Sequence, residues 1–489
     1  MAQLGTNSVG RCLSVAVFFA LGACSAREEV TPRDSGSADG GSADGGDLDA
    51  ALVDEGMPVD AERPTDLGTD AAPGDAGPVA CGAATPRFAG SLCGPGAAAC
   101  VILRDERVEG GHSRNDAPAI ALDSADRPAI LYSIAEGGYR GMYATRGAAG
   151  AWSTVATGFE LATGGLVFDG DTPTALAYDG AYHTDVYTLG ASGWGRHERL
   201  PTDQVVSAVN VLRDEGGCLH VLGDPGTGMT GGTTTYLLRD ATWHATAVGG
   251  GSQPRPSALA LAPSGQPHVV WTESGGTTSE LRWARGPAGS ELVWAGGAGA
   301  GYGNVPRIGV SASSAIETPH VLFLVPKADG SSDLYYATRA SAGSWSVVLL
   351  ELGRPAGCTG TPVAGATCSA DGLSFVPVAV IASGSGDVRL FWGRNHETGT
   401  LTGRCDVGPF PGGGGPPPPP PFCFWDGALT RDARLIVGTP GLPSAEVGAG
   451  IDLLTATAVL DGAGHVHIAA YDTASGGTGV RYLMVGAPL

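Results

Sequence analysis

The sequence predicts an all-β protein whose main domain is a seven-bladed β-propeller, with six or eight blades as the neighbouring alternatives. Three observations support this fold class. Glycine accounts for 80 of 489 residues while charged residues make up only 16%, a composition that favours many turns between short apolar strands. A pattern of four strand-like pieces recurs after about residue 100, and tryptophans follow it at regular spacing. Such regular self-similarity is typical of repeat architectures.

Residues 1–23 have the features of an export signal. Arg11 precedes a mostly apolar run that ends at Ala23, which is too short to span a bilayer. Its end, Leu-Gly-Ala-Cys24, resembles the bacterial lipobox, which implies cleavage before Cys24 and attachment of lipid to its thiol. The alternative is an ordinary signal peptide in which Cys24 is incidental. We expect an exported lipoprotein of the cell envelope, and Ser25 resembles a signal for sorting to the outer membrane.

Residues 24–80 are predicted to form a disordered acidic tether. From Ser25 to Ala80 there are 14 Asp or Glu residues against three Arg, and the segment Ser-Ala-Asp-Gly-Gly occurs twice. A segment with so little apolar content cannot offset the entropy lost on ordering. Calcium capture by the Asp-Gly units is the alternative, but the spacing of known calcium loops is missing. The acidic balance and the single lysine, Lys327, make nucleic acid an unexpected partner.

The cysteines after Cys24 favour disulfides over a metal site. They are Cys81, Cys93, Cys100, Cys218, Cys358, Cys368, Cys405 and Cys423. Their even number suits an oxidising compartment, and the lack of a Cys-x2-Cys pair argues against zinc. We predict Cys358–Cys368 and Cys405–Cys423, because each pair brackets a Gly/Pro-rich excursion with no cysteine inside. The first four cysteines, three of them in a Cys-rich lead-in at 81–100, admit three pairings that the sequence leaves open.

The predicted propeller spans residues 101–489. Its clearest repeat comprises Pro118–Asp123, Arg127–Tyr132, Met142–Arg146 and Gly150–Trp152, and further clear copies begin at Pro256 and Pro306. Weaker copies end at Trp194 and Trp243. Trp152, Trp194, Trp243, Trp294 and Trp345 are 42, 49, 51 and 51 residues apart, the period of a four-stranded blade.

The last two repeats complete the predicted ring. The sixth is interrupted by insertions, and its strands are expected at Val376–Ala382, Val388–Trp392 and Phe424–Trp425. The seventh stops before its fourth strand, whereas Val101–Arg104 is an orphan strand ahead of the first copy. We therefore expect the two ends of the domain to complete one blade, which would close the ring and remove exposed sheet edges.

These units resemble repeats of bacterial secreted propellers, and are similar to degenerate Asp-box or sialidase-like repeats. The resemblance implies the propeller fold across residues 101–489. It supplies no catalytic residue, because Thr145–Trp152 and Thr338–Trp345 keep the Gly-x-Trp end of an Asp-box but lack its Asp. Tyr132, Glu136, Asp126 and Arg127 are chemically suited to sialidase-like catalysis, yet no matching motif joins them.

Four histidines occupy one position of the repeat, at the start of the second strand. They are His220, His268, His320 and His467. They could share a metal, but we favour a structural role in a turn or against a neighbouring blade, and we expect no metal and no cofactor. The sequence favours a membrane-anchored binding or scaffolding module over an enzyme, with a glycan or an envelope protein as partner. The alternative is a sialidase-like glycoside hydrolase at the propeller face.

Overall fold

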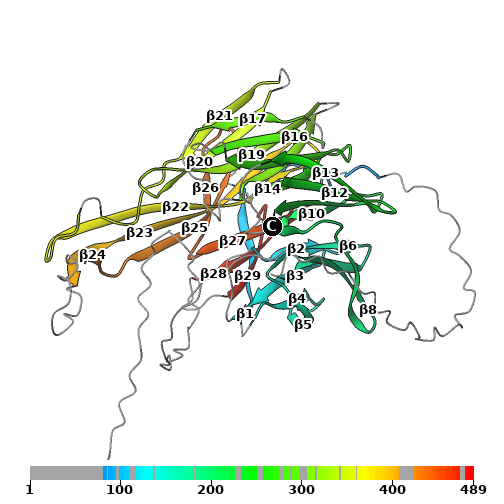
Figure 1. The fold of residues 1–489 in the computed structure, drawn as a ribbon, viewed down its shortest axis with the longest axis horizontal. Coiled ribbons are helices and arrows are strands. Elements are labelled where there is room, and N and C mark those ends of the chain that lie inside the picture. The colour runs from blue at the N-terminus through cyan, green and yellow to red at the C-terminus, as the bar shows by residue number, and fades with distance from the viewer. Residues whose placement is uncertain are drawn as a thin grey trace, which may run out of the picture. The chain divides into compact units, whose positions relative to one another are not determined.

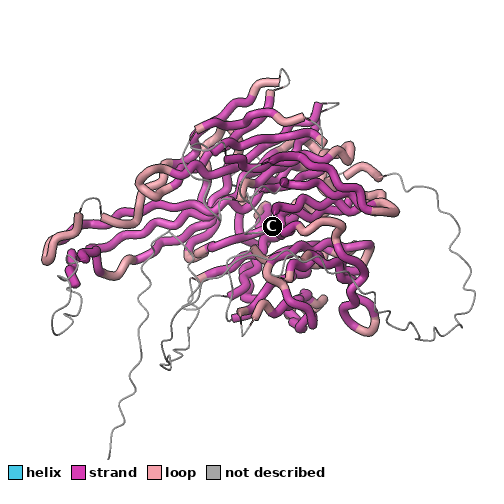
Figure 2. The backbone as a smooth tube through the Cα atoms, in the orientation of Figure 1, coloured by secondary structure: helices cyan, strands magenta, loops and turns pink. Residues whose placement is uncertain are grey.

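A computed structural model describes most of the chain from Cys81 to Pro488. The described residues are 81–84, 86–94, 99–110, 117–135, 138–179, 183–225, 233–250, 257–274, 279–286, 289–296, 305–313, 316–340, 343–358, 361–406, 422–473 and 479–488. The predicted signal peptide, Cys24 and the acidic tether lie outside them. No α-helix occurs within the described residues, which consist of strands joined by loops (Figure 2). Accordingly, none of them forms a helix long and apolar enough to cross a membrane.

The strands form seven antiparallel sheets, the blades of a seven-bladed β-propeller (Figure 1). Blade 1 contains β2 (Ala119–Leu122), β3 (Pro128–Ile134), β4 (Arg140–Arg146) and β5 (Trp152–Glu160). Blade 2 contains β6 (Thr163–Asp169), β7 (Thr172–Tyr178), β8 (Thr184–Gly190) and β9 (Gly193–Arg199). Blade 3 contains β10 (Gln204–Arg213), β11 (Leu219–Pro225), β12 (Thr233–Arg239) and β13 (Trp243–Gly250).

The remaining blades follow the same order with two departures. Blade 4 contains β14 (Ser257–Leu261), β15 (Pro267–Ser274), β16 (Ser279–Arg285) and β17 (Glu291–Ala295). Blade 5 contains β18 (Arg307–Ser313), β19 (Ile316–Pro326), β20 (Ser332–Arg339) and β21 (Trp345–Glu351). Blade 6 contains β22 (Thr367–Ala382), β23 (Val388–Asp406), β25 (Thr430–Gly438) and β26 (Ala445–Ala449), with β24 (Phe422–Asp426) paired to β23. Blade 7 contains β27 (Leu453–Leu460), β28 (Val466–Asp472), β29 (Gly479–Gly486) and β1 (Val101–Gly110).

The first strands of the seven blades contact one another in sequence around the ring. Contacts join β2 to β6, β6 to β10, β10 to β14, β14 to β18, β18 to β22, β22 to β27 and β27 back to β2. The ring closes where β1 pairs antiparallel with β29, so that the orphan strand supplies the fourth strand of blade 7. The predicted fold class and the predicted closure are both confirmed.

Aromatic side chains explain the regular tryptophans by joining adjacent blades. Trp294 packs against Tyr335 on the third strand of the following blade. Three other tryptophans, at the start of their fourth strands, pack against an aromatic ring on the third strand of the preceding blade. Ring centroids are 5.2 Å apart for Tyr482–Trp152, 5.2 Å for Tyr143–Trp194 and 5.6 Å for Trp283–Trp345. Edge-to-face pairs of this kind stabilise packing beyond the area they bury, by about 0.5–1.5 kcal/mol each.

Arginines that end third strands form a second set of contacts between blades. Three of them pair with a glutamate on the outer strand of the preceding blade, whereas Arg285 pairs with Glu317 on β19 of the following blade. The three pairs are Arg146–Glu106 at 2.8 Å, Arg239–Glu198 at 2.6 Å and Arg339–Glu291 at 2.7 Å. Two of them, at Glu106 and Glu291, are bidentate, the geometry that gives guanidinium–carboxylate pairs their directionality. The recurring Arg of the repeat is therefore used for assembly of the ring.

The prediction for the sixth repeat was wrong in its last strand. Phe424 and Trp425 belong to β24, which is not one of the four strands in the main path of blade 6; the third and fourth strands are β25 and β26. β22 and β23 extend beyond the blade as a long arm with β24 at its far end (Figure 1). An aromatic pair that ends an inserted hairpin resembles the Trp of a blade when only sequence spacing is considered.

Candidate functional site

The lead-in at 81–94 lies across one face of the propeller, which we call the covered face. This face is formed by the turns between the first and second strands of the blades. At blades 3 and 4, the Gly82 amide donates to Asp214 Oδ2 at 2.8 Å and the Ala84 amide donates to the Pro263 carbonyl at 3.2 Å. These contacts fix the beginning of the lead-in on one side of the ring.

The lead-in then reaches the blades on the other side of the ring. Arg87 bonds Asp126 in the blade 1 turn at 2.8 Å, and the Phe88 carbonyl accepts a bond from Gly384 in the blade 6 turn. Further along, the Leu92 amide donates to Asp387 at 2.8 Å. The described lead-in thus contacts turns of blades 1, 3, 4 and 6 on the covered face.

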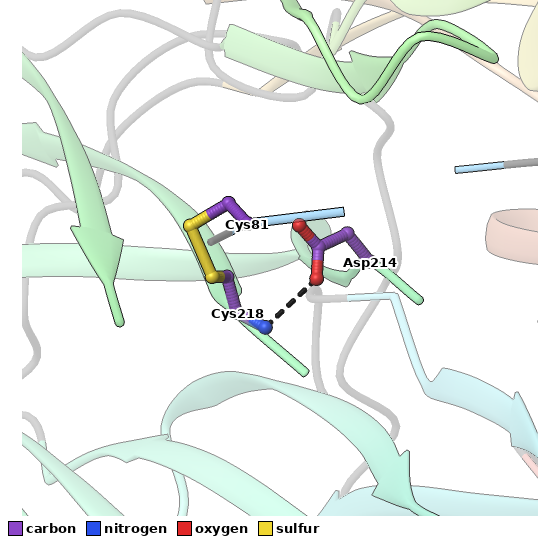
Figure 3. A group of neighbouring side chains, drawn as sticks. All are labelled: Cys81, Asp214 and Cys218. Atoms are coloured by element: carbon purple, nitrogen blue, oxygen red, sulfur yellow. Dashed lines mark hydrogen bonds between the residues drawn. A yellow bond between two sulfur atoms is a disulfide. The ribbon is translucent and has the colours of Figure 1, made fainter. Parts of the chain in front are cut away.

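A disulfide between Cys81 and Cys218 attaches the lead-in to blade 3 (Figure 3). With Asp214, these cysteines place three potential ligand atoms within 4.8 Å of one another. The group does not suit a metal, because disulfide sulfurs are not thiolates and the Asp214 carboxylate already accepts backbone bonds from Gly82 and Cys218. The remaining disulfides are Cys93–Cys100, Cys358–Cys368 and Cys405–Cys423. Cys358–Cys368 and Cys405–Cys423 coincide with the predicted local pairs. Cys81–Cys218 and Cys93–Cys100 together are one of the three pairings that the sequence left open.

Side chains and a strand bulge occupy the centre of the ring. The register of β10 shifts between Val206 and Val211, and the bulged residues Ala208 and Val209 pack against hydrophobic clusters of blades 1–2 and blades 4–5 respectively. Arg307 is buried, and its guanidinium donates to four backbone carbonyls of Val305, Pro306, Val378 and Ala456. It therefore joins the first strands of three consecutive blades, 5, 6 and 7.

The four repeated histidines are buried in the blades and do not converge on one point. Three of them contact a tyrosine on the third strand, at 2.6 Å for His220–Tyr236, 2.6 Å for His320–Tyr336 and 2.8 Å for His467–Tyr482. His220 and His467 also contact the aspartate of the preceding turn, whereas His268 faces Glu317 at 3.6 Å. Burial lowers the pKa of His268 and His320 to about 4. These contacts agree with the structural role favoured from the sequence.

The residues considered for sialidase-like catalysis also have structural contacts. Tyr132 is buried and donates to Glu109, and burial raises its pKa. Asp126 accepts bonds from Arg87 and from the Gly462 amide, and Arg127 bonds Asp123 in its own turn. Glu136 lies outside the described residues.

A polar pocket of about 200 Å³ lies at the base of the arm in blade 6. It is lined by Arg354, Leu373, Arg394, His396, Asp432 and Arg434. In the sheet register, Leu373, His396 and Asp432 lie side by side across β22, β23 and β25, so that their side chains share one face. Arg394 and Arg434 are opposed in an adjacent row of the same face. Arg354 follows β21 of blade 5 and reaches the pocket through a β-bridge to Leu373.

The pocket lies away from the covered face. β22 ends at Ala382 beside the blade 6 turn that the lead-in covers, and Leu373 precedes that end by nine residues. At the rise of an extended strand, this places the pocket about 30 Å from the covered turn. It therefore lies toward the opposite face, where the connections between second and third strands are located.

Carboxylates surround the arginines of the pocket. Arg394 makes a bidentate pair with Glu351 at 2.8 and 2.6 Å, and Arg354 pairs with Asp371 at 2.9 Å. Asp371 also contacts His396 Nε2 at 2.6 Å, and this bond holds the pKa of the Asp371 carboxyl below its usual value.

Arg434 on β25 also pairs with carboxylates. It bonds Asp432 through two nitrogens at 2.9 and 2.5 Å and also pairs with Glu446. The bond from Arg434 lowers the pKa of Asp432. Both acids whose pKa is lowered, Asp371 and Asp432, therefore stay ionised at neutral pH and can only accept hydrogen bonds.

No motif in the sequence points to this pocket. Its residues are spread from 354 to 434, and no catalytic or ligand motif joins them. The available signal was the alternation Arg394-x-His396 and Asp432-x-Arg434, because residues two apart on a strand share a face.

Comparisons with known proteins found only distant structural similarities. No protein-family model matches it, and no curated protein matches it. It is similar to a fucose-recognising lectin of Aleuria aurantia, described as a six-bladed β-propeller, with 13% identity over 59% of this chain and 93% of the lectin and a TM-score of 0.38. AofleA of Arthrobotrys oligospora matches with 11% identity over 73% of this chain and 99% of its own, at a TM-score of 0.37.

The polysaccharide lyase Uly1 is a further similar structure. It matches with 8% identity over 78% of this chain and 91% of its own, at a TM-score of 0.32. At these identities the matched structures do not specify a ligand or an activity for this chain.

Proposed function

We propose that the protein is an exported, lipid-anchored binding or scaffolding module of the cell envelope, displayed at the outer membrane. One observation supports this most directly. The described lead-in contacts turns of four blades on the covered face, so we assign recognition of a glycan or an envelope protein to the opposite face. Loops of several blades meet at such a face, which makes it a suitable recognition surface.

The chemistry of the pocket favours binding over catalysis. A glycoside hydrolase uses a carboxylic acid that remains protonated beside a second, ionised carboxylate. Asp432 in this pocket and Asp371, which contacts the lining residues Arg354 and His396, have lowered pKa values. Neither is suited to donate a proton to a leaving group, whereas both are suited to accept hydrogen bonds from a ligand.

Two measurements test the proposal. Metabolic labelling with a fatty acid should mark the wild-type protein and not the Cys24→Ala variant, and equal labelling would remove the lipid anchor from the proposal. Pull-down from envelope extracts, together with a glycan array, should recover a ligand with native protein and none with heat-denatured protein. Failure of the native protein in both assays would contradict a binding function.

A second candidate is a glycan-acting enzyme, and Asp224 on β11 favours it. Burial raises the pKa of Asp224 to about 7. Hydrogen bonds from Ser257 at 2.8 Å and Thr234 at 3.4 Å act in the opposite direction but do not outweigh burial. A carboxyl group with such a pKa can act as a general acid near neutrality. Turnover of sialosides or glycosides that disappears in Asp224→Asn would favour the enzyme, whereas we expect the wild-type protein to show none.

A further inference from the structure

We propose that the pocket formed by Arg354, Leu373, Arg394, His396, Asp432 and Arg434 binds one uncharged sugar residue. This rests on the proposed binding function and names its ligand class and its site. The lining comes from two adjacent blades, since Arg354 follows the last strand of blade 5 and the other five residues lie on β22, β23 and β25 of blade 6.

The charges at the pocket balance closely, which disfavours an anion as ligand. Three guanidinium groups, those of Arg354, Arg394 and Arg434, are paired with four carboxylates. These carboxylates belong to Glu351, Asp371, Asp432 and Glu446. A carboxylate or sulfate would have to compete with these internal pairs without a net positive field to attract it.

The hydrogen-bonding groups suit a polyhydroxylated molecule. Three guanidinium groups carry fifteen N–H donors, and the ion pairs within the site use six of them. Donors therefore remain beside ionised carboxylates that act as acceptors. A hydroxyl group donates one bond and accepts others, so neighbouring hydroxyls of a sugar can bridge a guanidinium to a carboxylate without separating the pair.

The size and the fixed geometry of the pocket indicate one sugar residue. Its volume of about 200 Å³ is below the roughly 300–1,000 Å³ of sites for drug-sized ligands. The bidentate pairs of Arg394 with Glu351 and of Arg434 with Asp432 restrain these side chains before a ligand arrives, which reduces the entropy lost on binding. Leu373 offers an apolar surface for the C–H groups of the ring.

Saturation-transfer NMR with the full mature chain tests the assignment. The probes are methyl glycosides of glucose, galactose and mannose, with glucuronate and inorganic sulfate as anions. A ligand this small should bind with a dissociation constant of about 1 mM. We expect signals from at least one neutral glycoside and their reduction by tenfold or more in Arg354→Ala and in Arg434→Met. Arg196→Ala is the matched control, because its side chain is 52% exposed like that of Arg354 and also pairs with an aspartate.

The outcomes separate the ligand, the site and the function. Circular dichroism and the thermal midpoint of each variant show whether the propeller is folded, and Arg354 lies outside the blade strands. If a neutral glycoside still binds to both variants, the pocket is not its binding site, although the binding function stands. Selective binding of glucuronate or sulfate overturns the ligand class. If no probe binds while envelope extracts still yield a ligand, the sugar assignment fails alone; if extracts also yield none, the proposed function fails with it.

Discussion

Removal of the Cys81–Cys218 disulfide should destabilise the propeller more than removal of a local disulfide. The two cysteines are 137 residues apart in sequence, whereas Cys358 and Cys368 are ten apart. In the chain-entropy model a disulfide restricts the unfolded chain more when it closes a longer loop. The expected losses in the free energy of unfolding are about 5 kcal/mol for Cys81→Ser/Cys218→Ser and about 3 kcal/mol for Cys358→Ser/Cys368→Ser.

The structure also predicts a local effect of removing this disulfide, at the start of the lead-in. Without its covalent link, the start of the lead-in keeps the bonds of Gly82 and Ala84 to the turns of blades 3 and 4. Such bonds contribute only about 1 kcal/mol each, so the segment should open before the blades unfold. Hydrogen exchange should therefore speed up at Gly82 and Ala84 in the Cys81→Ser/Cys218→Ser variant.

Guanidinium denaturation followed by tryptophan fluorescence measures the global effect, with linear extrapolation to water. Peptide mapping under non-reducing conditions first establishes that the other three disulfides remain as assigned. An equal or smaller loss for the Cys81→Ser/Cys218→Ser variant than for Cys358→Ser/Cys368→Ser would refute the reasoning from loop length. Unchanged exchange at Gly82 would show that the lead-in is held by contacts other than the disulfide.

Three further predictions concern buried polar groups. Arg307→Met should lower the free energy of unfolding by about 3 kcal/mol or more, since four carbonyl partners lose a charged donor; chemical denaturation checks this, and a loss as small as that in Arg354→Ala would contradict it. The pKa of His320 falls from 6.5 to about 4 on folding, so the folded state binds fewer protons and stability should decline as pH falls from 6.5 to 4. His320→Gln should reduce this slope by up to about 1.4 kcal/mol per pH unit, and an unchanged slope in denaturation curves would count against it. The pKa of Asp224 rises from 3.8 to about 7 on folding, so it should lower stability as pH rises through that window; Asp224→Asn should remove this decline, and a persistent one would show that another group causes it.

The blades could be predicted because their signals are local. In blade 5, for example, Pro319 to Phe323 forms part of β19, Leu334 to Arg339 lies in β20, and Trp345 begins β21. Apolar runs, turn residues and a tryptophan lie within one repeat, so each blade can be recognised without knowing its neighbours. Blade 6 departed from this rule because its insertion adds strands whose aromatic residues, Phe424 and Trp425, mimic those of a repeat.

The candidate site was less accessible to sequence reasoning. The structural role of the histidines followed from their position, and contacts such as His320–Tyr336 agree with it. The pocket, in contrast, depends on the register that opposes Arg394 to Arg434 and His396 to Asp432. The two members of each pair are separated in the sequence by a Gly- and Pro-rich insertion, so their spacing in the sequence carries no information about their alignment.

The sequence by itself determined the β-propeller class, the strand content of the repeats and the closure of blade 7 by β1, because alternation and turn chemistry act over a few residues and the seventh repeat visibly lacks a strand. The tertiary structure alone decided which face is covered, which partner Cys81 takes and where ionised side chains gather into a pocket. Leu92 and Asp387 meet across nearly three hundred residues, as do Cys81 and Cys218 across 137. Contacts of this kind depend on how the blades are arranged in the ring, and local sequence preferences do not determine that arrangement.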